Sequence, residues 1–228
     1  MDAEARWRRL AKVAALAVIL ILVAEHFLPH GVDLNPVDHW LSEYALSRLA
    51  FARWLIRVAF AALATVAVVV AQSAKSRLSR WAFLTSAAGL ASMILFDTDP
   101  NDGRPIRFLW PPTAGNLHQI ALYVAIGGAL SGMVLAWRNA SALQRLCLSV
   151  SAVATAVQVC LVAVSQACHE MTHFGGITER LVVLAMLAWA ILEFGVYNGS
   201  CEEPHTFSPP RWSWPGAIRQ RRRMGPLR

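Results

Sequence analysis

The sequence predicts an all-α membrane protein in which six transmembrane helices form a bundle and both termini lie in the cytoplasm. Of 228 residues, 56% are hydrophobic and only 15% are charged. The apolar residues form blocks of about twenty, the length that crosses a bilayer as a helix. The basic residues lie in short segments between these blocks. The net charge of +7 is therefore explained by basic residues that set the membrane topology. We expect the partner to be the lipid bilayer and expect no binding of nucleic acid.

The chain divides into a basic amino-terminal segment at 1–9, a transmembrane domain at 10–198 and a Pro- and Arg-rich tail at 199–228. The tail has no apolar period, so we expect it to be largely disordered and cytoplasmic. The first apolar block also fits a signal peptide, but it lacks a clean small-x-small cleavage site and is better explained as a span. The predicted spans are residues 10–28, 51–72, 81–96, 115–137, 146–167 and 179–197.

The connection before the second span becomes amphipathic at its end. Ser42 is placed there to cap a short interfacial helix that begins at Glu43. Arg53 and Arg57 lie one turn apart in the second span, where they are expected to reach headgroups or to pair with nearby acids.

Small and polar residues predict how the later spans pack. Gly128 and Gly132 form a small-xxx-small pair, which favours close helix contact. Thr178 is placed to cap the sixth span, and Glu193 near its far end is expected to pair with a loop arginine. The fifth span carries a polar stripe, which is expected to face the bundle interior, either for interhelical hydrogen bonds or as a lined pathway. Its residues are Ser151, Thr155, Gln158 and Ser165.

The distribution of basic residues predicts the orientation. The amino terminus, the turn after span two, the turn after span four and the tail hold 4, 3, 2 and 6 Lys or Arg. With six spans these segments share one side, which the positive-inside tendency identifies as the cytoplasm. We therefore expect a multi-pass protein of the cell (inner) membrane. Its basic termini, including Arg221–Arg223 near Trp212 and Trp214, are expected to contact anionic lipid headgroups.

The opposite face then collects six of the seven histidines and nine of the fourteen acids. Imidazoles and carboxylates in a partly desolvated mouth can bind a divalent metal, move protons or hold a polar headgroup. The predicted binding residues are Asp97, Asp99, His118, Glu179 and Arg180. The predicted metal ligands, for zinc or another divalent cation, are His118, His169, His173 and Asp97.

The segment Cys168–Arg180 contains the letters H-E-x-x-H at 169–173. On a helix, histidines four residues apart can bind one zinc ion while the glutamate activates water. Here Gly175 and Gly176 follow the motif closely, at positions where a zinc-binding helix would have to continue. The motif is therefore expected to lie at the end of a helix. The candidate catalytic residues are Glu170, Ser42 and Glu43.

Two functions from different classes remain open. The first is binding of a lipid headgroup, an ion or a small solute at the outward-facing His/Asp/Glu site. The alternative is a membrane-embedded, metal-dependent hydrolase that acts on lipid or peptide at the outer face, which needs at least three ligands to converge at about 2.0–2.2 Å from a zinc ion. A structural role as a partner subunit is a third interpretation, and the sequence leaves the oligomeric state open.

Four short motifs carry a family resemblance: SEYALS at 42–47, FDTDP at 96–100, His118 at the start of span four and GITERL at 176–181. Together they resemble the bacterial membrane family known as domain of unknown function 998, over nearly all of residues 10–197. The resemblance implies a six-span integral membrane protein without an assigned reaction. It also assigns Glu179 and Arg180 to the family pattern and leaves the H-E-x-x-H letters outside it.

Overall fold

The computed structural model describes residues 3–25, 27, 39, 41–47, 49–98, 113–168 and 174–196. Every regular element in these ranges is a helix, which confirms the predicted all-α class. The elements are α1 (Ala3–Glu25), the 3-10 helix η1 (Leu41–Leu46), α2 (Ala50–Ser73), α3 (Arg77–Leu95), α4 (Ala114–Ala136), the 3-10 helix η2 (Trp137–Asn139), α5 (Ala142–Cys168) and α6 (Gly175–Val196).

Four helices of the described residues are long and apolar enough to cross a membrane: Ala50–Ser73, Arg77–Leu95, Ala114–Asn139 and Ala142–Val164. They correspond to the second to fifth predicted spans. Large apolar side chains on them remain exposed, as with Trp54 at 58% and Val153 at 64%, which suits contact with lipid. The chain is therefore a multi-pass membrane protein. The first and sixth predicted spans fall in α1 and α6 and stay predictions.

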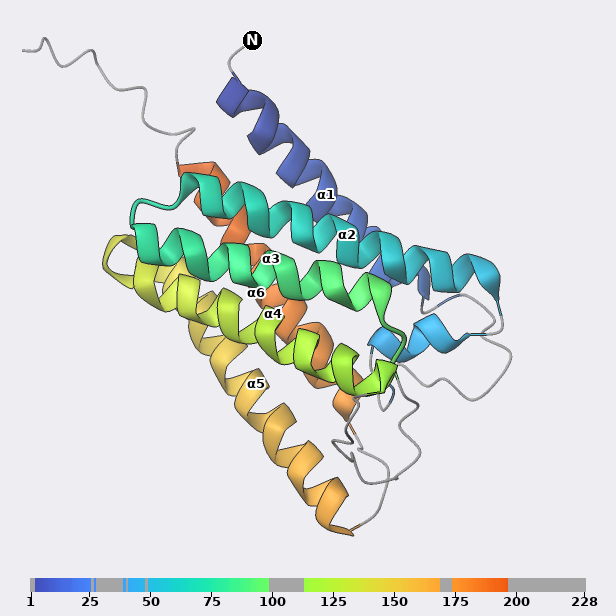
Figure 1. The fold of residues 1–228 in the computed structure, drawn as a ribbon. Coiled ribbons are helices and arrows are strands. Elements are labelled where there is room, and N and C mark those ends of the chain that lie inside the picture. Colours follow the sequence, from blue (N-terminus) through green and yellow to red (C-terminus); the bar gives the residue numbers. More distant parts are fainter. Residues whose placement is uncertain are drawn as a thin grey trace, which may run out of the picture.

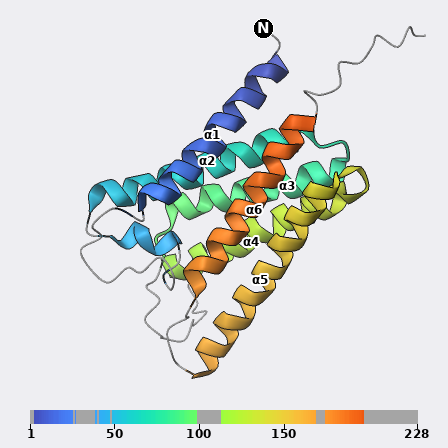
Figure 2. The ribbon, with the colours of Figure 1, turned by 180° about the vertical axis from the view of Figure 1, so that it is seen from behind.

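The helices form two layers (Figures 1 and 2). Helices α2, α3 and α4 lie side by side in one layer, and successive helices run in opposite directions. Helices α1, α6 and α5 form the second layer, in which α1 packs on α2 and α5 packs along α6. Helix α5 diverges from α4 toward its carboxyl end (Figure 1). The connections between helices therefore gather at two opposite ends of the bundle.

Glycines bring α3 and α4 into direct backbone contact. A Cβ atom added to Gly89 would lie 2.6 Å from the Ala125 backbone nitrogen, and one added to Gly128 would lie 2.6 Å from the Ser86 nitrogen. The Ser79 hydroxyl also donates a hydrogen bond of 3.0 Å to the Gly132 carbonyl. The close helix contact predicted from Gly128 and Gly132 is confirmed.

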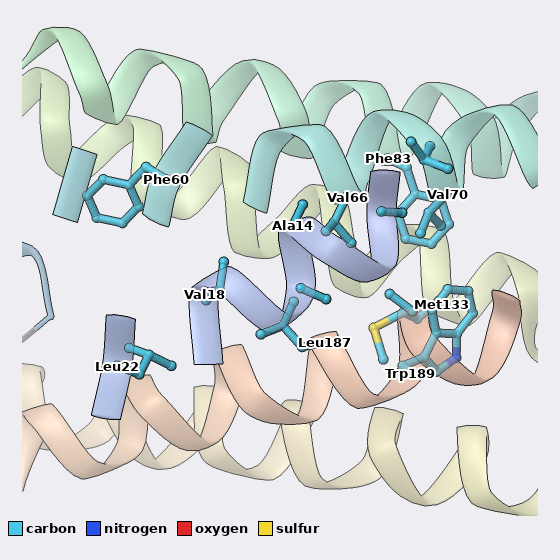
Figure 3. Close-up of a cluster of buried hydrophobic side chains, with 14 of the residues drawn as sticks. Ala14, Val18, Leu22, Phe60, Val66, Val70, Phe83, Met133, Leu187 and Trp189 are labelled. Atoms are coloured by element: carbon cyan, nitrogen blue, oxygen red, sulfur yellow. The ribbon is translucent and has the colours of Figure 1, made fainter. Parts of the chain in front are cut away.

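The core fills the space between the two layers. Figure 3 shows side chains of α1, such as Val18, and of α6, such as Leu187, directed toward Phe60 and Val66 of α2. At one end of this core the Phe83 and Trp189 rings pack with centroids 5.5 Å apart. Aromatic and aliphatic side chains of all six α-helices thus hold the layers together.

Two predicted helix starts are wrong. Ser42 lies inside η1, fully buried, and does not cap a helix beginning at Glu43. A 3-10 helix forms there instead, and α2 begins only at Ala50. Thr178 does not cap α6, because α6 already begins at Gly175. The Thr178 hydroxyl donates to the Phe174 and Gly175 carbonyls from within the first turn.

The polar stripe of α5 is largely turned inward. Ser151 and Gln158 are buried, and the Thr155 hydroxyl donates to the Ser151 carbonyl at 2.8 Å. The side chain of Ser165 lies outside the described residues. Glu193 of α6 accepts a hydrogen bond of 2.8 Å from the Gln144 amide, where the sequence had suggested a loop arginine. Ser151 and Gln158 therefore face the bundle interior, as predicted, and the Thr155 hydrogen bond lies within α5 itself.

Adjacent glycines of α4 test the backbone contact. We expect Gly128→Ala to lower the free energy of unfolding by about 1–3 kcal/mol, because the new methyl group overlaps the α3 backbone. Gly127→Ala is the matched control, since nothing lies within 4 Å of its added Cβ. Its greater helix propensity should leave stability unchanged or raise it by about 0.5–1 kcal/mol. Thermal unfolding in detergent measures both, and equal midpoints for the two variants would contradict the proposed packing.

Candidate functional site

One end of the bundle is where α1 and α3 end and where α4 and α6 begin (Figure 1). Polar side chains are buried at this end. We call this the polar end; it is the end that the sequence predicts to face outward. Isolated polar groups are costly to bury in a membrane protein, so their concentration here indicates a specific role. None of the following is more than 9% exposed: Glu25, Ser42, Glu43, Thr98, Asn116, His118, Gln119, Thr178, Glu179 and Arg180.

Arg180 connects the elements of the polar end. Its Nη1 donates hydrogen bonds to the Gly176 carbonyl at 2.9 Å and to the His39 carbonyl at 3.2 Å. Its guanidinium group lies 5.3 Å from the centroid of the Tyr44 ring. The Arg180 charge also acts on the carboxylates of Glu25 and Glu179. One buried guanidinium group therefore ties the first turn of α6 to η1 and to the end of α1.

Glu179 and Glu43 supply two further links. Glu179 Oε2 accepts a short hydrogen bond from the Leu41 backbone N–H, which anchors η1 on α6. Glu43 Oε2 lies 3.3 Å from Nδ1 of His39, four residues earlier in the chain. We define the polar cluster as Glu25, Glu43, Tyr44, Glu179 and Arg180. It combines three carboxyl groups, a phenol and a guanidinium group from three separate elements.

Tyr44 is fully buried within η1. Burial raises the pKa of its hydroxyl group, and the nearby Arg180 charge opposes this increase. Tyr44 therefore stays neutral at physiological pH. It can contribute a neutral hydroxyl group to the polar cluster, but no negative charge.

His118 occupies a second position at the polar end, in the first turns of α4. Its Nδ1 lies 2.8 Å from the Phe96 carbonyl oxygen, which can only accept, so Nδ1 carries a proton. In neutral His118 this leaves Nε2 in the acceptor form. Its ring packs edge-on against Phe60 at 6.3 Å between centroids. The histidine thereby joins the end of α3 to the start of α4.

Asp97 lies apart from these buried groups. Its carboxylate forms an ion pair of 3.0 Å with Arg57 of α2, and both side chains are at least half exposed. This confirms that Arg57 pairs with a nearby acid. The pair lies on the surface, where such contacts contribute about 0–1 kcal/mol.

An apolar cavity of about 90 Å³ lies between the two layers of helices. Side chains of α2, α3, α4 and α6 line it, among them Phe60, Phe83, Met133 and Trp189. Among its lining residues Glu179 is the single charged one. We call it the interlayer cavity. It is an apolar space with a buried carboxylate at the polar end and an indole ring among its walls.

The structure brings together some of the predicted site residues. Ser42 and Glu43 lie in η1, next to Glu179 and Arg180 of α6, whereas Asp97 lies on the exposed surface. The metal site stays a prediction. The Nδ1 of His118 is hydrogen-bonded to the Phe96 carbonyl oxygen, which leaves Nε2 as the nitrogen that could bind a metal. The described residues contain no group of three His, Cys, Asp or Glu that could hold a metal ion. Asp99, His169, Glu170 and His173 lie outside them.

Sequence reasoning missed His39 and Tyr44. The spacing of His39 and Glu43, four residues apart, was the available signal for their contact. The position of Tyr44 beneath Arg180 had no such signal, because the two residues are 136 positions apart and meet only through the packing of η1 on α6.

The fold and the buried polar end define this class of protein: an all-α, multi-pass membrane protein with ionisable groups concentrated at one end of its helices. The chain belongs to the family described as Protein of unknown function (DUF998), whose model matches residues 12–194. This confirms the resemblance drawn from the four short motifs. The chain matches no curated protein and no solved structure.

Two arginines test the architecture of the polar end. We expect Arg180→Met to lower the free energy of unfolding by about 1–3 kcal/mol, since two backbone carbonyls lose their charged donor. Arg57→Met removes an exposed ion pair and should change stability by less than about 1 kcal/mol. Thermal unfolding in detergent distinguishes them, and a larger loss for Arg57→Met would show that the buried contacts are misassigned.

Proposed function

We propose that this chain binds the polar headgroup of a lipid or a small amphipathic molecule at its polar end. A short apolar part of that molecule, about a few carbon atoms, occupies the interlayer cavity of about 90 Å³. The observation that carries the proposal is the position of Glu179, which belongs to the polar cluster and also lines the apolar cavity. An amphipathic ligand is the class of molecule that matches a space with these two parts.

The chemistry of the polar cluster supports a headgroup that carries hydrogen-bonding and charged atoms. Arg180 offers a planar set of donors, and Glu25, Glu43 and Glu179 offer acceptors. Ser42 adds a buried hydroxyl oxygen that has no hydrogen-bond partner within the described ranges. Such groups are worth more in a partly desolvated site than in water. Recognition of the headgroup then comes from η1 and α6, and affinity comes from the buried apolar part.

We further propose that α1 and α6 complete a six-span bundle in the cell inner membrane, with both termini in the cytoplasm. The alternating helix directions support this arrangement, because they put the basic turns before α3 and after α4 at the end opposite the polar cluster (Figure 1). The basic terminal segments would then contact anionic headgroups of the inner leaflet.

Filling the interlayer cavity tests ligand binding. Ala129→Phe places a ring in the cavity, whereas Ala152→Phe places the same ring on the exposed face of α5. After purification in mild detergent, mass spectrometry of extracted amphiphiles should show about tenfold less per protein for Ala129→Phe, a loss of about 1.4 kcal/mol in binding. Ala152→Phe should match the wild type. Equal retention by all three proteins would reject the proposed function.

Single cysteines test the topology in a background without the native cysteines. A membrane-impermeant maleimide should label Asp97→Cys in intact cells, since the Asp97 side chain is 63% exposed at the polar end. Ser76→Cys and Asn139→Cys lie in the opposite turns and should react only after the membrane is permeabilised. Labelling of all three in intact cells would overturn the proposed orientation.

A further inference from the structure

A second cavity lies at the opposite end of the bundle from the polar cluster. Its volume is about 370 Å³, and it is formed where α2 ends, α3 begins, α4 ends and α5 begins, with α6 as its fifth wall. We call it the inner cavity. Its walls include Lys75, Ser76, Asn139, Gln144 and Glu193, so it is far more polar than the interlayer cavity.

We propose that the inner cavity binds a small zwitterion that carries a carboxylate and an ammonium group, as a free amino acid does. The two charged residues that line it are Lys75 and Glu193, one of each sign. In a zwitterion, the carboxylate can lie near Lys75 and the ammonium group near Glu193, so both contacts are attractive. A simple anion would be repelled by Glu193, and a simple cation would be repelled by Lys75.

The inner cavity has an exposed rim and a buried floor, as binding sites have. Lys75, Leu135 and Asn139 are exposed and form an open rim. Ser79, Phe83, Gln144 and Trp189 are buried and form the floor. A solute can therefore enter from the aqueous side, and its inner part meets ordered side chains.

Glu193 is held in place by Gln144. The Gln144 amide oxygen accepts from the Ser141 backbone N–H at 2.8 Å, and its amide nitrogen donates to Glu193 Oε2, also at 2.8 Å. Both ends of the amide are thus committed, which fixes its orientation and the position of the carboxylate. A positioned carboxylate in a partly buried cavity favours an ammonium group.

Trp189 provides an unused donor beside the same cavity. Its indole Nε1 is buried and has no hydrogen-bond partner in the part of the chain that the structure describes. Leaving such a donor unpaired costs about 1–3 kcal/mol. Because Trp189 also lines the inner cavity, this N–H is a candidate donor to a ligand carboxylate, with the Lys75 ammonium group at the rim as a second attraction.

The experiment measures equilibrium binding of a radiolabelled mixture of free amino acids to the purified full-length chain. We expect saturable binding that unlabelled amino acids displace, whereas N-acetyl amino acids and amino-acid methyl esters displace it at least tenfold less well, because each lacks one charge. Glu193→Gln and Lys75→Met should each weaken binding at least tenfold, and Trp189→Phe should weaken it while keeping the aromatic contact with Phe83.

Two variants serve as controls. Ser149→Ala lies on the exposed face of α5 and should bind as the wild type does. Glu179→Gln changes the polar end alone, so it should reduce amphiphile retention and leave amino-acid binding intact, which separates this inference from the proposed function. The inference is rejected if the wild type binds no amino acid above the detergent background, if both derivatives compete equally well, or if binding survives in Glu193→Gln and Lys75→Met.

Discussion

The backbone contact between α3 and α4 is the constraint on which the rest of the structure depends. Gly89 faces the α4 backbone and Gly128 faces the α3 backbone, so neither position has room for a side chain. In lipid, helices associate mainly through such close packing, because apolar side chains gain little by leaving an apolar solvent. The layer of α2, α3 and α4 is therefore the tightly packed half of the molecule. Both cavities are lined by side chains of α6 together with side chains of α2, α3 and α4, so they lie where the second layer packs against the first.

Helix α6 explains why the polar groups lie at the two ends of the bundle. Glu179 is in its first turns, Glu193 is near its last turn, and apolar residues such as Met186 lie between them on the wall of the interlayer cavity. A charge in the middle of the bilayer is expensive to desolvate, whereas one near either surface keeps access to water, to headgroups or to a partner. Each glutamate has a hydrogen-bond donor from another element, the Leu41 N–H for Glu179 and the Gln144 amide for Glu193.

The blocks of apolar residues were sufficient to predict the four helices that are long and apolar enough to cross a membrane, because length and composition alone decide that property. The Gly128 contact and the family were also predictable, since both rest on short local patterns. The start of α6 was not predicted correctly. Thr178 does not precede the helix as a cap, because it lies inside the first turn, where its hydroxyl donates to the Gly175 carbonyl. The contact of Arg180 with Tyr44 depends on how η1 packs against α6, which no local pattern encodes. The inner cavity was missed for the same reason, as five helices line it.

The two cavities share a wall made of Val70, Phe83 and Trp189. Apart from the Trp189 N–H this wall is apolar, so a polar solute in the inner cavity would lose most of its hydrogen bonds on passing it. Phe83 is confined: its ring occupies the space beside Gly132, where an added Cβ would lie 2.7–2.8 Å from ring atoms, and it packs on Trp189. The Phe83 ring therefore cannot withdraw toward α4. Trp189 forms another part of this wall, and it belongs to α6, which also carries Glu179 and Glu193. The carboxylates that line the two cavities, Glu179 and Glu193, are thus carried by one helix, with the shared apolar residues between the cavities.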